Sequence, residues 1–377
     1  MTNHSQSPET RSLAKAAVTT RLVLGESRLP SKPISDPDLI TVMIPTRNRV
    51  NTLQVFLDSL GKTTAQKDKV VVWLYVDEDD TASLEFLESV WVKSQPLRTN
   101  YLIGPQTISM SEMNHHLWQG STHNSGIYLC ATDDSMYITE GWDEIVRQAF
   151  NEYSDRLVLV YPDDPVTPGL ATIPILSAEW LNLVGHFSTE YFPFWYDDMW
   201  NDEIAQMIGR RVQIPMKVQP QGGKGLTPRM HNLPFWQNFY LCTIDERLAS
   251  ARELRKSICR EGTREFEEGE KNAQIMAEKF VMKHTYSVDH LKIAEPKYSD
   301  PIKMANPRAQ TLYAIIEAQA VAHLWIKYQD RSLRGDFRGA RDVLNALDLA
   351  HQKSPSLETI RADLESRARK SLRAGNS

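Results

Sequence analysis

Two adjacent carboxylates, Asp133 and Asp134, follow a short apolar run in the segment GIYLCATDDSMYITEGWDE, residues 126–144. The apolar run at 127–130 has the composition of a buried parallel strand. Open α/β sheets bind ligands at the carboxyl ends of their strands, where these two carboxylates fall. Their hard oxygens suit a divalent metal, which can in turn hold phosphates. The pair also fits a solvated, Asp-rich turn, and the two residues alone leave both readings open.

Strands and helices alternate around this segment. Strand-like runs of β-branched and aromatic residues occur at 39–45, 70–76, 101–103 and 127–130. Helical spacing of apolar residues follows the first three runs, at 46–61, 81–94 and 111–119. We expect the first of these helices to end at Gly61. The alternation predicts right-handed βαβ units and an α/β fold with a mainly parallel sheet flanked by helices.

The pattern becomes mixed after Trp142. We expect a helix at 145–153, a strand at 157–164, a strand leading into a helix at 171–185 and an aromatic, acidic stretch at 192–211 that becomes helical. Residues 219–229 (QPQGGKGLTPR) are Gly-rich and predict a loop, which could serve as a mobile lid. They lack the Gly-Lys-Ser/Thr spacing of a Walker A loop. From residue 296 the chain predicts one or two helical hairpins.

Length and composition set the class of protein. The 377 residues, 41% hydrophobic and 24% charged, are typical of a soluble protein with a sizeable core. We expect a flexible arm at 1–38, an α/β domain at 39–250 and a helical region at 251–377. The chain has no apolar run of the ~18 residues that a membrane span needs, so we expect a cytoplasmic protein. Its three cysteines form no CxxC pair and predict neither disulfides nor a zinc site.

Charge is spread unevenly along the chain. The formal net charge is −5, yet residues 296–377 hold 14 Lys and Arg against 9 Asp and Glu. A basic tail on an acidic body fits a solvated helical surface, and it also fits a polyanionic partner such as nucleic acid.

The order of these motifs resembles the GT-A glycosyltransferases, specifically the large family-2-like group that uses nucleotide-sugar donors, over residues 39–245. The segment VMIPTRNR resembles the first strand and loop of that fold. The resemblance implies that Pro45, Thr46, Arg47 and Asn48 border the nucleotide. YVDEDD resembles the second strand end, which implies that Asp77 contacts the base or ribose.

The metal motif of the family has its counterpart in CATDDSMYITEGWDE. The resemblance implies that Asp134 binds Mn²⁺ or Mg²⁺, with Asp133 contributing through water and His231 completing the site. SEMNHHLWQG resembles the segment that places an Asn, here Asn114, just before the metal strand. Thr132 stands where a strict DxD motif has its first carboxylate.

An acidic pair in FPFWYDDMWNDEIAQMIG occupies the place of the family's general base. Asp198 is the first choice because we expect it in the loop before a helix. Asp202 is the second choice, and it also fits an N-terminal helix position where a carboxylate interacts favourably with the dipole. The nearby aromatic residues fit core packing or stacking on a sugar: Trp195, Tyr196, Trp200 and Trp236.

The resemblance implies a metal-dependent transfer of a sugar from a nucleotide-sugar, most simply a UDP-sugar, to a hydroxyl of a glycan or small molecule. A carboxylate base implies inversion at the anomeric carbon. Two alternatives stay open: the same transfer onto a hydroxylated base in DNA or RNA, and a non-catalytic module that binds nucleotide-sugars or glycans. A nucleotidyltransferase needs a Gly-rich loop after the first strand, which TRNRVNTL does not supply. Arg47 and Arg49 fit either phosphate or base contacts, or surface ion pairs.

Overall fold

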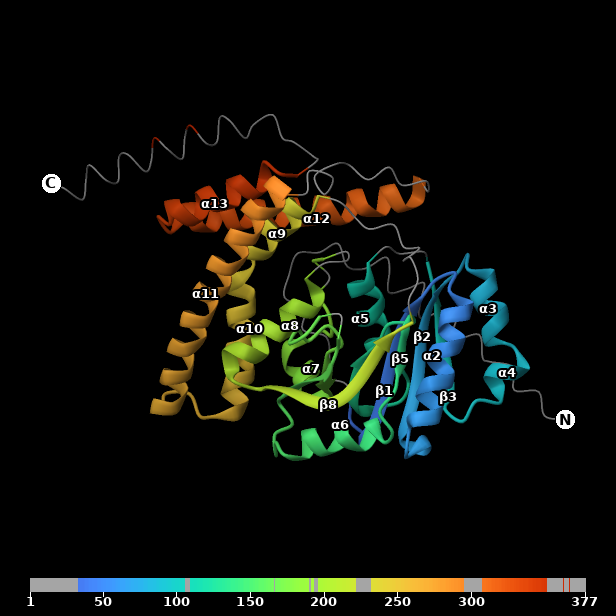
Figure 1. Ribbon diagram of the computed structural model, residues 1–377. Coiled ribbons are helices and arrows are strands. Elements are labelled where there is room, and N and C mark those ends of the chain that lie inside the picture. Colours follow the sequence, from blue (N-terminus) through green and yellow to red (C-terminus); the bar gives the residue numbers. More distant parts are fainter. Residues whose placement is uncertain are drawn as a thin grey trace.

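A computed structural model describes residues 33–105, 109–165, 167–189, 191–192, 196–221, 232–294 and 307–350, and residues 362 and 366. In this part of the chain an eight-stranded sheet is flanked by helices, and further helices follow it (Figure 1). The strands are β1 (Asp36–Thr46), β2 (Val70–Asp77), β3 (Arg98–Gly104), β4 (Ser125–Cys130), β5 (Ser135–Tyr137), β6 (Leu159–Asp163), β7 (Ile175–Ser177) and β8 (Arg211–Pro220). Their order is β3-β2-β1-β4-β7-β6-β8-β5.

Strand direction brings the polar ends of three strands to one edge. β1 pairs in parallel with β2 and β4, and Val42 lies opposite Val72 and Leu129. β7 runs antiparallel between β4 and β6. β5 is the outermost strand on the side opposite β3, and it pairs antiparallel with β8. This mainly parallel sheet, covered by helices, confirms the predicted α/β architecture, and it is GT-A-like.

The helices of the first two hundred residues lie around this sheet. They are α2 (Val50–Thr63), the short 3₁₀ helix η1 (Lys67–Lys69), α3 (Thr81–Leu87), α4 (Val90–Lys93), α5 (Met110–Gly120), α6 (Trp142–Asn151), α7 (Ala178–Val184) and α8 (Asp197–Ile208). The expectation that Gly61 ends a helix is wrong, because α2 continues to Thr63 and Gly61 packs closely against Pro96. The helix expected at 81–94 is two helices, because Ser89 caps a new one.

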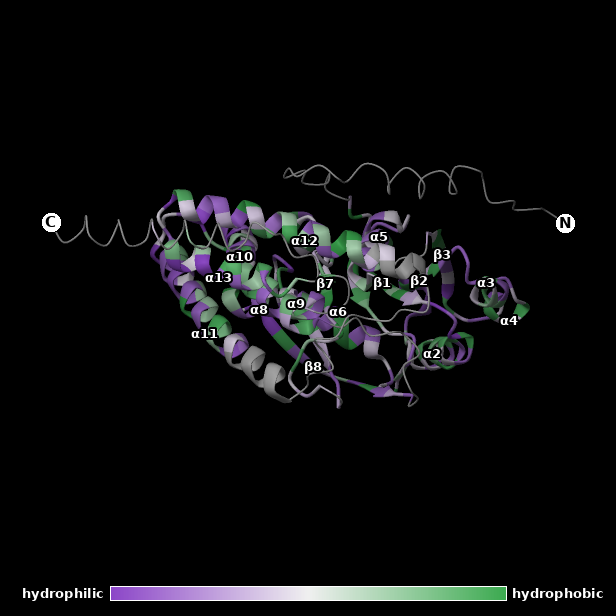
Figure 2. Ribbon diagram, turned by 90° about the horizontal axis from the view of Figure 1, so that it is seen from above, coloured by the Kyte–Doolittle hydropathy of each residue, from purple (hydrophilic) through white to green (hydrophobic). Residues whose placement is uncertain are grey.

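Five further helices with described bounds follow β8. They are α9 (Leu233–Cys242), α10 (Ile244–Ile258), α11 (Arg264–Ala294), α12 (Pro307–Leu333) and α13 (Phe337–Leu347). Seen from above, α3 and α4 lie at one end of the molecule and α11 and α13 at the other, with the sheet between them (Figure 2). The boundary expected between 250 and 251 falls inside α10. In the described ranges no helix is long and apolar enough to cross a membrane.

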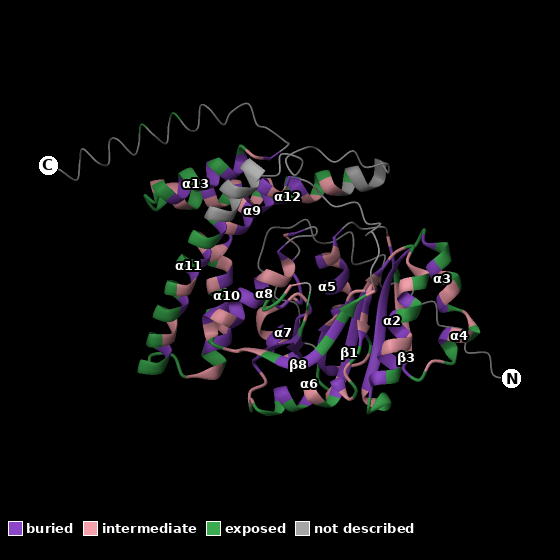
Figure 3. Cartoon of the chain, in the orientation of Figure 1, coloured by how far each residue is buried: buried purple, intermediate pink, exposed green. Residues whose placement is uncertain are grey.

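Apolar side chains cover both faces of the sheet, and the strands at its centre are buried (Figure 3). On one face, Val42 and Ile44 pack with α2 and α6. On the other face, Met43 and Tyr128 belong to a core that continues through α5, α7 and α8 into α9–α13. The helices after residue 232 therefore share one continuous core with the sheet.

Candidate active site

The end of β1 and the loop after it, residues 46–49, connect two acidic strand ends. The Thr46 hydroxyl donates to Asp133 Oδ2 at 2.7 Å. Arg49 Nη1 donates to Asp133 Oδ1 at 2.9 Å and to Asp134 Oδ2 at 3.1 Å. A single guanidinium thus bridges the two carboxylates that follow β4.

The same loop is joined to the end of β2. Arg47 donates to Asp77 Oδ2 at 2.7 Å and to Asp79 Oδ2 at 2.9 Å. The backbone N–H of Asn48, a residue with a positive φ of 53°, donates to Asp80 Oδ2 at 2.7 Å. Asp80 also caps α3. The structure therefore brings Thr46, Arg47 and Asn48 together with Asp77 and Asp133.

The two carboxylates after β4 differ in exposure. Asp133 is buried, and burial raises its pKa against the opposing effects of the Thr46 hydroxyl and Arg49. The Asp134 side chain is half exposed, and its Oδ1 has no hydrogen bond to the described residues. Asp133 is consequently the internal anchor of the loop, and Asp134 is the carboxylate that a ligand can reach.

A divalent metal would have Asp134 as its accessible protein ligand. A carboxylate oxygen without a hydrogen bond to the described residues is a hard donor that suits Mn²⁺ or Mg²⁺. No group of three or more His, Cys, Asp or Glu side chains in the described ranges is arranged to hold a metal ion. His231 lies outside those ranges. Asp134 therefore fits as one ligand, and the remaining positions of a complete site would have to come from elsewhere.

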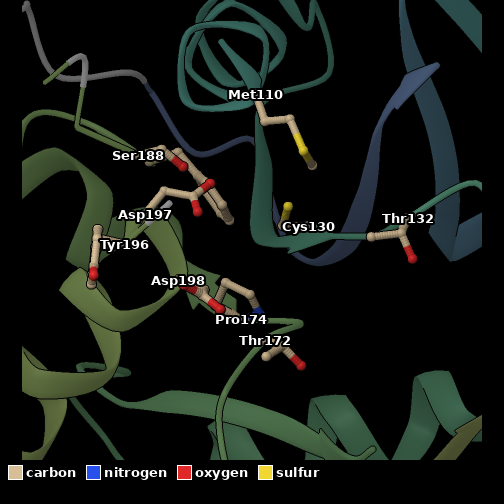
Figure 4. Close-up of a pocket in the computed structure, with 10 residues that line it drawn as sticks. Met110, Cys130, Thr132, Thr172, Pro174, Ser188, Tyr196, Asp197 and Asp198 are labelled. Atoms are coloured by element: carbon tan, nitrogen blue, oxygen red, sulfur yellow. The ribbon is translucent and has the colours of Figure 1, made fainter. Parts of the chain in front are cut away.

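A pocket of about 210 Å³ opens beside this edge of the sheet (Figure 4). Residues from the start of α5, the end of β4, the segment before β7, the loop after α7 and the start of α8 line it: Met110, Cys130, Thr132, Thr172, Pro174, Phe187, Ser188, Tyr196, Asp197 and Asp198. In the close-up, Asp197 and Asp198 lie on one side, and Met110, Cys130 and Thr132 lie on the opposite side. The pocket thus places an acidic pair across from the motif that carries Asp133 and Asp134.

The acidic pair occupies the first turn of α8. The expectation that Asp198 lies in a loop is wrong, because α8 begins at Asp197 after Tyr196, whose φ is 73°. Carboxylates are favourable at this end of a helix because they face its positive dipole. Burial first, and then the charge of Asp198, raise the pKa of Asp197 to about 7. Burial also raises the pKa of Asp198, although the N–H of Met199 donates to its Oδ1 at 2.7 Å.

Asp202 lies apart from the pocket lining. It accepts from Arg211 Nε and from Gln206 Nε2, the latter at 3.0 Å. Arg211 also lies over the Tyr161 ring, with its Cζ atom 4.3 Å from the ring centroid. Asp202 is in the second turn of α8 rather than at its start, and its contacts are those of a residue that fastens α8 to β8.

Asn114 is fully buried in α5, and its amide nitrogen and oxygen have no hydrogen-bond partner among the described residues. Its amide lies close enough to influence the thiol of Cys130, a pocket residue.

The Gly-Trp-Asp after the acidic motif has a structural role. Trp142 Nε1 donates to Thr64, and Asp143 accepts from the backbone N–H of Ala65.

The sequence did not predict several of the residues that line the pocket. Ser188 and Thr172 come from irregular segments with no periodic pattern. β8 was also missed, and the loop expected at 219–229 was placed too early, because Gln219 and Pro220 belong to β8 and pair with β5. Gln221 donates to the backbone oxygens of Asp133 and Ser135 at 3.4 and 3.1 Å. Residues 222–230 lie outside the described residues.

No protein-family model matches the sequence, and no curated protein matches it. Similar solved structures include residues 1–349 of S. aureus TarS in complex with UDP-GlcNAc. The two sequences are 12% identical, the match covers 89% of this chain and 92% of the TarS chain, and the TM-score is 0.47. Another is the mannosyltransferase PcManGT from Pyrobaculum calidifontis in complex with GDP-Man and Mn²⁺, at 13% identity over 89% and 91% of the two chains, with a TM-score of 0.40. The order and direction of its own strands, with helices on both faces, give this chain a GT-A-like α/β fold.

Proposed function

We propose that the protein transfers a glycosyl unit from a nucleoside diphosphate sugar to a hydroxyl group of a glycan or small molecule. One observation carries this proposal: Asp197 and Asp198 share a pocket with Thr132, the residue that directly precedes Asp133 and Asp134. A proton acceptor for a hydroxyl therefore shares one cavity with the strand end that leads into the two donor-side carboxylates. These are the two halves that a displacement at a sugar carbon needs.

Asp198 is the general base in this proposal. The Met199 N–H stabilises its carboxylate, so Asp198 is the member of the pair that retains the negative charge when the two share one proton. A raised pKa also brings a carboxylate closer to the pH at which base catalysis is efficient. Asp197, whose pKa is about 7, then lies beside the base as its partly protonated neighbour.

The donor lies at the strand ends. The loop with Pro45, Thr46, Arg47 and Asn48 borders the nucleotide, and Asp77 is the acceptor for ribose hydroxyls. When bound at Asp134, with His231 as the prospective second ligand, Mn²⁺ or Mg²⁺ supplies Lewis-acid stabilisation of the leaving diphosphate. Asp133 holds the loop through Thr46 and Arg49, and Asn114 supports the Cys130 wall of the pocket.

The reaction is a single displacement. The acceptor oxygen attacks the anomeric carbon on the face opposite to the diphosphate, and its proton passes to Asp198. The bond between the anomeric carbon and the phosphate oxygen breaks, and the nucleoside diphosphate leaves with the electron pair. The product has the inverted configuration.

A glycan or small molecule is the acceptor that the described residues favour. Three basic side chains of α12 and the turn after it are already paired with carboxylates: Lys327 with Glu246, Arg331 with Asp245 and Arg334 with Asp330. These charges are less available to a phosphate backbone. Most of the other basic residues after 296 lie outside the described side chains.

A thermal-shift panel tests the donor half of the proposal. UDP-glucose, UDP-GlcNAc, GDP-mannose and the free nucleoside diphosphates are compared with and without Mn²⁺. We expect one nucleotide to raise Tm, and a saturating ligand at 100 times its Kd stabilises by about 2.7 kcal/mol. Asp134→Asn should remove the Mn²⁺-dependent part of that shift, whereas Asp58→Asn, on the exposed side of α2, should keep it. Failure of every nucleotide to change Tm would contradict the proposal, and binding without turnover would favour the non-catalytic module.

A further inference from the structure

Three ionisable side chains form a buried cluster behind the acidic pair. Glu203 of α8, Arg247 of α10 and His284 of α11 are each at most 3% exposed. His284 Nε2 lies 2.7 Å from Glu203 Oε1, and Arg247 Nε lies 3.1 Å from Glu203 Oε2. One carboxylate of α8 therefore holds two helices that follow the sheet.

The cluster reaches the pocket through stacked rings. Arg247 Cζ lies 3.7 Å from the centroid of the Tyr240 ring, and its Nη1 donates to the Tyr240 carbonyl at 3.0 Å. The Tyr240 ring in turn stacks on the Tyr196 ring, with centroids 4.7 Å apart and planes at 22°. Tyr196 lines the pocket and immediately precedes Asp197.

Two routes therefore connect the cluster to the acidic pair. One runs along α8 from Glu203 to its first turn. The other runs through Arg247, Tyr240 and Tyr196 to the residue at which α8 begins. A left-handed residue at that position, Tyr196 with φ of 73°, is strained unless its surroundings hold it. The stack on Tyr240 is one of the ring contacts that hold it, together with the Phe192 ring at 5.8 Å.

We infer that Arg247 is a positioning residue for the acidic pair, and that α9–α11 are an integral part of the catalytic site. Through Glu203 and Tyr240, Arg247 fixes the direction in which α8 presents Asp197 and Asp198 to the pocket. The consequence for activity rests on the proposed function, whereas the bracing itself does not. A buried ion pair adds little net stability by itself. We therefore argue the role of this cluster from its contacts with α8 and Tyr240.

Hydrogen exchange tests the bracing without any substrate. The full-length Arg247→Met variant removes the charge and keeps an unbranched apolar side chain. We expect amides at 197–204 to exchange about tenfold faster than in the wild type, with those of β1 and β2 unchanged. Arg252→Met is the matched control, because Arg252 is on the same helix, is half exposed and pairs with Glu261. Equal acceleration throughout the chain, or none at 197–204, would overturn the inference.

Kinetics test the consequence for catalysis. Arg247→Met should lower kcat by about 10- to 100-fold, because small misplacements of reacting groups have effects of that size. The donor KM should stay within about twofold, since the strand-end loops are untouched. A fall in Tm with unchanged kcat would show that Arg247 acts only on stability.

A second variant covers a failure of Arg247→Met to fold. Glu203→Gln keeps the shape and the hydrogen bond to His284 while it removes the charge that Arg247 meets, and it is judged by the same exchange and kinetic results. A wild type that is inactive with every donor would refute the proposed function, and the exchange experiment would still decide whether the cluster braces α8.

Discussion

Arg49 lies between Asp133 and Asp134 and donates to both carboxylates, at 2.9 and 3.1 Å. Asp133 is buried, so this guanidinium is the charge that offsets it inside the protein. The contact ties the loop after β1 to the acidic motif after β4. Arg49 is therefore the ionic link between the two halves of the proposed donor site, beside the hydrogen bond from Thr46 to Asp133.

Replacing Arg49 tests that dependence. Arg49→Met should lower the free energy of unfolding at pH 7 by about 1–3 kcal/mol, because it leaves a buried carboxylate without its ionic partner. The pKa of Asp133 is already raised by burial, and losing Arg49 raises it further. A raised carboxyl pKa stabilises the folded state at low pH and loses that contribution as pH rises. The deficit should therefore be smaller at pH 5 than at pH 7 in urea denaturation. Equal deficits at both pH values would contradict this prediction, and Arg49→Lys should lose less.

The two candidates for the base make different predictions. Asp198→Asn should lower kcat by about 10²- to 10⁴-fold, because the acceptor proton loses its destination, while the donor KM changes little. Asp202→Asn should keep kcat within about threefold but destabilise the fold by about 1–3 kcal/mol, because it breaks the contact with Arg211. Release of nucleoside diphosphate and urea denaturation measure the two effects. A larger kcat effect at Asp202 would reverse the assignment.

The pH dependence of stability tests the environment of Asp197. Its pKa is about 7 in the folded protein, whereas an aspartate in an unfolded chain titrates near 3.9. Between those values the folded state binds more protons, so its stability falls as pH rises through about 4 to 7. Asp197→Asn removes this loss and should gain up to about 4 kcal/mol on the wild type between pH 4 and pH 8. Tm values at the two pH values give the comparison, and a difference that does not change with pH would count against a raised pKa.

Glu246 of α10 tests the attachment of α12. Burial would raise its pKa, but the hydrogen bond with His323 and the charge of Lys327 lower it to about 2. Such a carboxylate stabilises the fold above its unfolded pKa and loses that effect as pH falls from about 4.5 to 2. Glu246→Gln should lose roughly 2 kcal/mol at pH 7 and less at pH 3. Asp330→Asn, which breaks the exposed pair with Arg334, should lose at most about 0.5 kcal/mol, and an equal loss from both variants would contradict the prediction.

The strands that form the centre of the sheet could be predicted from sequence because their signal is local. β1, β2 and β4 are largely apolar runs that end at or just before polar residues. The sequence therefore predicts both the strands and the polar edge of the sheet at which they end. β8 alternates buried Ile214, Met216 and Val218 with exposed residues. One of the exposed positions is Pro215, and a proline inside an apolar alternation argues against a strand, so β8 was missed.

The candidate site was predictable where it depends on strand ends and unpredictable where it depends on tertiary packing. Thr46, Asp77 and Asp133 meet because parallel strands end at one edge. Nothing in the local sequence places Ser188 opposite Cys130, or joins Glu203 to His284 across 81 residues. Asp198 and Asp202 are both acidic and four residues apart, so the local sequence does not distinguish a pocket residue in the first turn of α8 from a partner of Arg211 in the second.

The configuration of the first product tests the central claim most directly. The protein is given the nucleotide-sugar that raises its Tm, and proton NMR follows the anomeric signal of the product before mutarotation. Direct displacement with Asp198 as base predicts the inverted anomer, and it predicts loss of that signal in Asp198→Asn. An early product with retained configuration, or the same rate of product formation in Asp198→Asn, would contradict the account.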